Sequence, residues 1–222
     1  MGSSSGFPVD LILFGMIAAF LVLRLRSILG RRTGFERPAQ TYQPAPGQSA
    51  PGPVIEGHAE TTTPAARTLP EAGSPTGQTL GRMQSVDRNF NPATFLEGAE
   101  KAFRIIVAAF AAGDRATLRS LLSDETYRSF DQAISARETA GQTQVSTIHA
   151  IHATSIESAD LRSSLASIAV RFVSDQTSFT RDKGGHTVLG TEAVTEITDV
   201  WSFERDLAAR DPTWRLVAAR SA

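Results

Sequence analysis

The chain contains no cysteine and only two lysines, Lys101 and Lys183, among its 222 residues. Without cysteine there can be no disulfide framework, no thiol nucleophile and no zinc site that needs a sulfur ligand. The absence is compatible with a reducing compartment. Length and composition alone, with 41% hydrophobic and 20% charged residues, do not decide between one large domain and a smaller domain with appended segments.

The chain also has almost no net charge, −1 at pH 7, but its charged residues are unevenly distributed. Residues 1–37 carry five arginines against Asp10 and Glu36, a net charge of +3. Residues 38–86 have a net charge of −1 and residues 87–222 a net charge of −3. Because the basic segment is confined to the N-terminal end, we do not expect a nucleic-acid partner.

Long apolar runs are missing except for one near the N-terminus. As a helix this run would span roughly 20 Å, less than the roughly 30 Å of a hydrocarbon core. Counting from Phe7 to Leu29, with Arg24 and Arg26 at one interface, gives a segment of about the required ~20 residues. We predict a membrane anchor with a basic flank over 1–37. Its apolar residues are Leu11, Ile12, Leu13, Phe14, Ile17, Phe20, Leu21, Val22 and Leu23.

The order of charges around this run distinguishes an anchor from a cleaved signal peptide. The segment Met1–Gly6 is uncharged, whereas arginines follow the run at the place where a signal peptide would be cleaved. We therefore favour an uncleaved anchor, with a helix lying in the membrane plane and a signal peptide as alternatives. The arginines place the rest of the chain in the cytoplasm or its topological equivalent.

Residues 38–86 lack any helical or strand period. They contain eight of the eleven prolines, and their only aromatic residue is Tyr42. Such a segment cannot bury a core, so we predict a disordered linker. As a flexible coil it would reach at least about 40 Å.

Residues 87–222 carry the patterns of a globular domain that begins with helices. Asn91-Pro92 is typical of an N-cap followed by proline at the first helical position. Apolar residues then recur at steps of three and four from Phe95 to Phe110, and Gly113 ends the helix. Two shorter helices are expected before residue 140.

Strands follow the helices. Alternation and β-branched residues predict strands over Val145–Ile156, Leu165–Val173 and Thr187–Phe203, and a last strand that begins at Trp214. Helices followed by successive strands indicate an α+β fold. In this fold the helices pack on a curved, mainly antiparallel four-stranded sheet.

Catalytic and metal-binding motifs are absent. There is no dinucleotide-binding glycine motif, P-loop, nucleophile elbow or HExxH sequence. His149 and His152 are three apart on a predicted strand and should face opposite sides of the sheet, so we expect no shared metal. The carboxylates of Asp175, Asp182 and Glu192 flank a predicted turn, where acidic residues ordinarily serve solubility. We expect no metal and no cofactor.

An enzyme would need an acid and a base that meet in a pocket of the fold. Tyr127, Asp199 and His152 are the candidates, but the sequence pairs none of them, and we expect no enzymatic activity. The large aromatics Trp201, Phe203 and Trp214 are either core or the lining of an apolar groove. With Phe103 and Phe110 they form our candidate pocket for a lipid or a protein partner.

Four segments carry a distinctive combination of residues: Phe95–Ala99, Phe110–Asp114, the W-x-F-E-R element at Trp201–Arg205 and the D-P-x-W-x-L element at Asp211–Leu216. Together they resemble the Tim44-like domain family. The family includes the C-terminal domain of the mitochondrial inner-membrane subunit that tethers the import motor, and membrane-anchored bacterial proteins. The resemblance implies a cystatin-like or nuclear-transport-factor-like cone with a large apolar pocket, contact with acidic lipid and an adaptor role at the inner membrane.

The resulting hypothesis is a membrane-anchored, non-enzymatic adaptor at the bacterial inner membrane, with its domain on the cytoplasmic side, or on the matrix side in a mitochondrion. Its partners would be membrane lipid and a protein such as a heat-shock chaperone or a translocase component. The alternatives are a carrier of lipid or a small apolar ligand, and an isomerase or hydratase on the same fold. Assembly factors of secretion channels are a topological rival, but their domain lies outside the cytoplasm, against the arginine placement.

Overall fold

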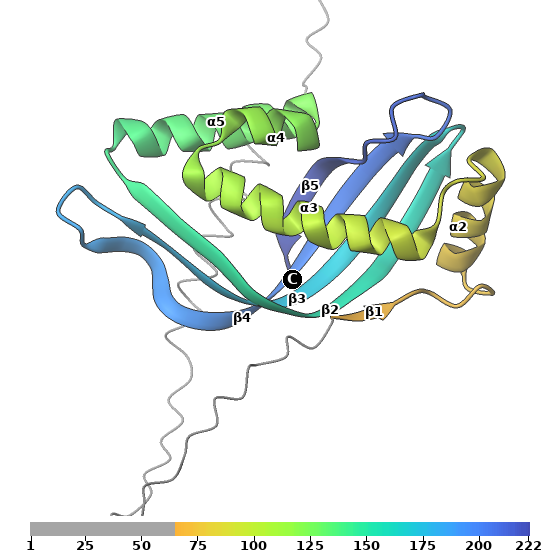
Figure 1. The fold of residues 1–222 in the computed structure, drawn as a ribbon, viewed down its shortest axis with the longest axis horizontal. Helices are drawn as coiled ribbons and strands as arrows, with labels where there is room; N and C mark the ends of the chain where they lie inside the picture. Colours follow the sequence, from red (N-terminus) through yellow and green to blue (C-terminus); the bar gives the residue numbers. More distant parts are fainter. Residues whose placement is uncertain (1–64) are drawn as a thin grey trace, which may run out of the picture.

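The computed structural model describes residues 65–222. Its helices cover the concave side and one end of a curved sheet (Figure 1). The helices are α2 (Pro75–Val86), α3 (Pro92–Ala112), α4 (Arg115–Leu121) and α5 (Asp124–Thr139). The strands are β1 (Ala66–Thr68), β2 (Thr143–Arg162), β3 (Leu165–Arg181), β4 (Thr187–Asp206) and β5 (Arg215–Ser221). The predicted α+β class is confirmed.

The predicted membrane anchor and residues 38–64 of the predicted linker lie outside the described residues. Within residues 65–222, no helix has both the length and the hydropathy of a membrane span.

The sheet has five strands rather than the four predicted. Its order is β1-β2-β3-β4-β5, with β1 parallel to β2 and every other neighbouring pair antiparallel. The additional strand β1 is three residues long, too short to produce a period in the sequence. Its Arg67 donates two hydrogen bonds to Glu100 on α3, at 2.8 and 2.9 Å, and one to Glu97 at 3.2 Å. These bonds hold the start of the domain against α3.

The domain also begins earlier than the boundary predicted at residue 87, since β1 and α2 lie within the segment assigned to the linker. The side chain of Ser74 caps α2 by accepting a hydrogen bond from the Gly77 N–H at 3.1 Å, and a proline follows it. This is the same start signal as Asn91-Pro92. Helix α2 escaped detection because only Leu80 and Met83 are buried apolar residues in its 12 positions.

Helix α3 has the limits that the sequence predicted. The Asn91 side chain accepts hydrogen bonds from the backbone N–H groups of Ala93 and Thr94, at 2.9 and 3.2 Å. At the other end Gly113 adopts a left-handed conformation with φ of 73°, which a residue with a Cβ adopts at a cost. The caps fix where the apolar face of α3 begins and ends, and so which residues meet the sheet.

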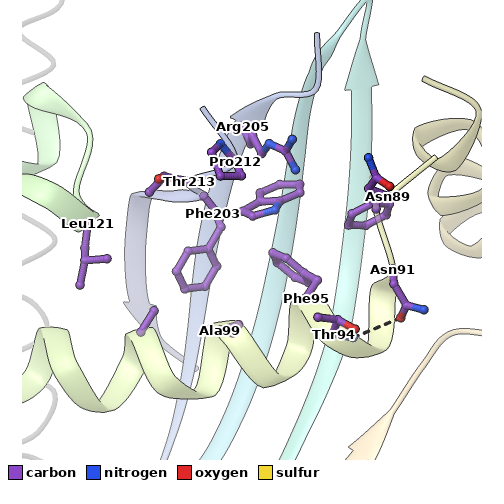
Figure 2. A pocket seen from close by; sticks show the side chains of 14 residues that line it. Asn89, Asn91, Thr94, Phe95, Ala99, Leu121, Phe203, Arg205, Pro212 and Thr213 are labelled. Atoms are coloured by element: carbon purple, nitrogen blue, oxygen red, sulfur yellow. Dashed lines mark hydrogen bonds between the residues drawn. The ribbon is translucent and has the colours of Figure 1, made fainter. Parts of the chain in front are cut away.

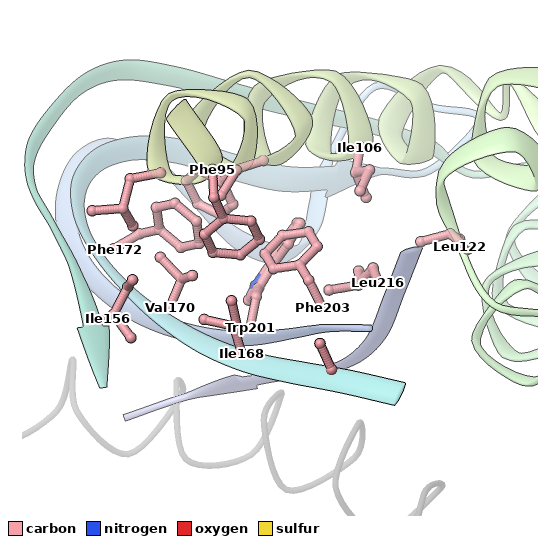
Figure 3. Close-up of a cluster of buried hydrophobic side chains, with 14 of the residues drawn as sticks. Phe95, Ile106, Leu122, Ile156, Ile168, Val170, Phe172, Trp201, Phe203 and Leu216 are labelled. Atoms are coloured by element: carbon pink, nitrogen blue, oxygen red, sulfur yellow. The ribbon is translucent and has the colours of Figure 1, made fainter. Parts of the chain in front are cut away.

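Aromatic rings fill the centre of the helix–sheet interface (Figure 3). Phe103 of α3 and Phe172 of β3 stack with ring centroids 4.4 Å apart, and Trp201 of β4 meets Phe103 edge-on at 4.6 Å. Phe103 and Phe172 are 0% exposed and Trp201 is 6% exposed. The middle of the cone is therefore a packed core, and the pocket that the resemblance implies must lie elsewhere.

The expectation that His149 and His152 face opposite sides of the sheet is wrong. The His149 ring lies 2.9 Å from the hydroxyl of Thr177, and the His152 ring lies 2.9 Å from the carboxylate of Asp175. Thr177 and Asp175 are two residues apart on β3 and share its outer face. The register of β2 shifts at both histidines, and such bulges break the simple alternation of a strand.

Candidate functional site

A groove of about 360 Å³ opens at one end of the cone (Figure 2). One side is the N-terminal half of α3 and the turn that precedes it. The other is formed by the C-terminal end of β4 and the segment Pro212–Trp214 that leads into β5. The volume is at the lower end of the ~300–1,000 Å³ typical of ligand pockets. It suits a few side chains of a partner or a small apolar ligand.

The walls of the groove are aromatic. The rings of Phe95 and Trp214 meet edge-on with centroids 4.7 Å apart, and Phe95 meets Phe203 at 6.2 Å. Phe90, from the turn before α3, lies 5.8 Å from Trp214. Phe90, Phe95 and Phe203 are buried, whereas Trp214 is half-buried. Each ring is held by its neighbours, so the groove presents a preformed apolar surface.

Beyond Phe95, small residues line the helical side of the groove. Gly98, Ala99 and Ala102 line it from α3. A Cβ added at Gly98 would meet no heavy atom within 4 Å, and Gly98 is exposed. Since these side chains project little, a partner can approach the backbone of α3 at this position.

A mostly buried ion pair stands at the rim of the groove. Arg205 lines the groove, and its Nη2 atom lies 3.1 Å from Oδ2 of Asp87, the residue that ends α2. The two side chains are only 14% and 11% exposed. The Nε atom of Arg205 is buried and has no hydrogen-bond partner within residues 65–222. This pair joins the end of α2 to the end of β4 beside the groove.

The segment that carries Trp214 is held by a side-chain turn. The backbone N–H of Thr213 donates to Oδ1 of Asp211 at 2.9 Å. Hydrogen bonds from the Thr213 hydroxyl and backbone N–H, with a smaller contribution from Arg215, lower the pKa of Asp211. The ionised carboxylate therefore keeps Pro212 and Thr213 in place over the groove at neutral pH.

The structure divides the five residues that the sequence singled out for a pocket. Phe203 and Trp214 line the groove. Phe103 and Trp201 belong to the packed core beneath it. Phe110 lies toward the C-terminal end of α3, where its ring meets Phe130 at 4.9 Å.

Phe90, Phe95 and Arg205 also line the groove, although the sequence did not single them out for a pocket. Phe95 was recognised only as part of the helical period and of the family resemblance. Phe90 lies in the turn between α2 and α3, and α2 was not predicted. Arg205 stands in the W-x-F-E-R element, so the element itself marks one wall of the groove, because Phe203 and Arg205 are two residues apart on β4 and both line it.

The three candidates for acid–base chemistry do not come together. Asp199 lies on the core side of the sheet, where it accepts hydrogen bonds from Gln176 at 2.9 Å and Ser221 at 3.0 Å. His152 lies on the opposite, outer face. Tyr127 is on α5, with the Arg119 guanidinium 4.2 Å from its ring centroid. The arrangement offers no convergent acid and base among these three residues.

The family model of the Tim44-like domain matches residues 76–221. The chain belongs to the Tim44-like domain family. The match begins within α2 and so includes both sides of the groove. No curated protein matches the chain.

Solved structures of low similarity accompany this family match. The intermembrane-space region of the chloroplast protein ARC6 has a TM-score of 0.44 at 12% identity, covering 60% of this chain and 97% of its own. A protein of the NTF2-like family from Streptomyces avermitilis has a TM-score of 0.36 at 16% identity, covering 59% and 97%. A conserved protein from Planctomyces limnophilus has a TM-score of 0.33 at 15% identity, covering 55% and 90%. The assignment to the Tim44-like family rests on the family model alone.

Proposed function

We propose that this Tim44-like protein is a non-enzymatic adaptor whose groove binds apolar side chains of a protein partner. The observation that carries the proposal is a preformed apolar groove: the rings of Phe203 and Trp214 lie on one side, and Phe95 and the exposed Gly98 of α3 lie on the other. A partner helix can place one or two large apolar residues between these sides, as in other helix-in-groove interactions. The family's import-motor role makes a heat-shock chaperone or a translocase component the first partner to test.

We further propose that residues 1–37 anchor the protein in the bacterial inner membrane, or in the mitochondrial inner membrane, and that the Tim44-like domain works on the cytoplasmic or matrix side. The arginines that follow the apolar run support this orientation. A fluorescent protein fused after Ala222 should then fluoresce in the bacterial cytoplasm. Alkaline phosphatase activity from a fusion at the same position would overturn the orientation.

The two other functions have less support. A lipid carrier needs an enclosed cavity, whereas Phe103, Phe172 and Trp201 fill the centre of the cone. An isomerase or hydratase needs an acid and a base in one pocket, whereas Asp199 and His152 lie on opposite faces of the sheet. Native mass spectrometry of the purified protein tests the lipid-carrier hypothesis, because it detects a ligand that co-purifies. A stoichiometric apolar ligand that co-purifies would favour it over the adaptor.

The test of the adaptor fills the groove without disturbing the fold. Gly98→Leu projects a side chain into the open space above α3, and replacing glycine within a helix is expected to raise stability by up to about 1 kcal/mol. Gly81→Leu on α2 is the matched control, because Gly81 is also helical, exposed and free of neighbours within 4 Å, but lies outside the groove.

A photoreactive residue at the exposed Thr94, on the rim of the groove, supplies the readout in intact cells. A partner that crosslinks in the parent protein and in the Gly81→Leu variant, but not in Gly98→Leu, supports the adaptor. Crosslinking that is equally strong in both variants would show that the groove is not the contact surface.

A further inference from the structure

Three side chains from three neighbouring strands meet on the outer face of the sheet, away from the groove. They are His152 on β2, Asp175 on β3 and Glu196 on β4, and their nitrogen and oxygen atoms all lie within 4.8 Å of one another. The Nε2 atom of His152 is 2.9 Å from Oδ2 of Asp175. Asp175 and Glu196 are direct partners in the register of β3 and β4.

The backbone beneath these residues is part of the continuous sheet, and a bulge presents the histidine. Ile151 pairs with Ser174 and Ala153 with the next residue of β3, Val173, so that His152 is the extra residue in β2. Bulges re-aim side chains and are common beside functional sites. The side chains of His152 and Asp175 are 46% and 33% exposed, so an ion can enter from solvent and water can complete its coordination.

The charges of the cluster are not balanced by neighbouring cations. Like charges directly opposite each other on adjacent strands destabilise a sheet, and Asp175 and Glu196 form such a pair. Among residues 65–222, no arginine or lysine forms an ion pair with either carboxylate. The arginines Arg171 and Arg220 instead share Glu157, at 2.9 and 3.2 Å. With a neutral imidazole the cluster carries a charge of −2, which one divalent cation neutralises.

We propose that His152, Asp175 and Glu196 form a zinc site on the outer face of the sheet. One imidazole nitrogen and two carboxylate oxygens are ligands that Zn²⁺ accepts at about 2.0–2.2 Å. Tetrahedral ligands at that distance lie about 3.4 Å apart, which small side-chain rotations within the observed 4.8 Å provide. The nitrogen ligand favours zinc over Mg²⁺ and Ca²⁺, which prefer oxygen ligands. The site requires no cysteine, and it is independent of the adaptor function proposed for the groove.

Isothermal titration of the full-length protein with zinc chloride tests the site. We expect one zinc ion per chain, and a loss of affinity of about tenfold or more in His152→Gln and in Glu196→Gln, since even outer-shell partners of zinc ligands contribute 10–100-fold. His149→Gln is the matched control: His149 is a bulge residue on the same face, but it bonds Thr177 and is not part of the cluster. This variant should bind zinc like the parent.

Thermal unfolding of the same variants separates loss of binding from loss of folding. Without zinc, His152→Gln and Glu196→Gln should unfold close to the parent temperature, because both side chains are exposed. With saturating zinc, only the parent and His149→Gln should shift upward, by about 5 °C or more. The proposal is overturned by the absence of saturable binding at millimolar zinc, or by unchanged affinity in His152→Gln. An equal loss in His149→Gln, or stronger binding of Ca²⁺ than of Zn²⁺, would also overturn it.

Discussion

Breaking the ion pair between Asp87 and Arg205 is expected to destabilise the protein by more than breaking a surface salt bridge would. Its side chains are 11% and 14% exposed, with 3.1 Å between the charged atoms. Removing one partner of such a pair leaves a buried charge without compensation, which costs about 3–5 kcal/mol. The residual exposure places the expected value near the lower limit. We therefore expect Arg205→Met to lower the free energy of unfolding by about 3 kcal/mol, or roughly 6–12 °C in a domain of this size.

A double-mutant cycle in urea denaturation measures the pair. Asp87→Asn removes the charge but keeps the oxygen that accepts a hydrogen bond from the Asn89 N–H at 2.9 Å. The double variant should be much less destabilised than the sum of the two single variants, because neither buried charge then remains. If the single effects add to within about 0.5 kcal/mol, the two charges are screened by solvent, and the argument that a buried ion pair couples the end of α2 to β4 fails.

Three further predictions concern the core, a helix end and the acid side of the stability profile. Phe103→Ala should cost about 3–5 kcal/mol in urea denaturation, because the ring is fully buried and stacked; a cost below about 1 kcal/mol would contradict a packed centre. Gly113→Ala should cost about 1–2 kcal/mol, since φ is 73°; an unchanged melting temperature would refute that conformation. Hydrogen bonds from Arg115 lower the pKa of Glu138, so its contribution to stability is present above about pH 4.3, the ordinary value, and is lost as pH falls through the lowered one. Melting temperatures from pH 7 to pH 3 should therefore fall less steeply in Glu138→Gln, and parallel profiles would contradict the assignment.

The sequence predicted the elements whose ends carry strong local signals. Helix α3 begins at its asparagine cap and ends at Gly113 as expected, because caps and glycine act within one turn of the chain. The alternation that predicted a strand over Leu165–Val173 likewise agrees with β3, in which the alternate residues Ile168, Val170 and Phe172 are buried. The domain start was misplaced because β1 has no period and α2 buries little apolar surface. Both elements are stabilised by contacts with distant parts of the chain.

The groove and the outer-face cluster depend on relations between strands, which no local pattern specifies. Trp214 was recognised as a large aromatic, but its place beside Phe95 follows from packing across more than a hundred residues of chain. The positions of His149 and His152 follow from register shifts in β2. A bulge is decided by how two strands pair, so alternation within one strand could not reveal it. The sequence therefore identified some of the residues of a site, but it did not predict which residues they contact in the fold.

If residues 1–37 anchor the protein, as proposed above, the short strand β1 has a mechanical consequence for the domain, which is then held from its N-terminal side. Any pulling force from that direction reaches β1 first, before the core, and β1 is held by three residues of pairing with β2 and by the contacts of Arg67 with Glu97 and Glu100. Under load this strand should yield while the groove between α3 and β4 stays folded. Release of residues 66–74 would provide at most about 30 Å of extended chain. Under this load β1 would detach from β2 before the groove unfolds and releases a bound partner.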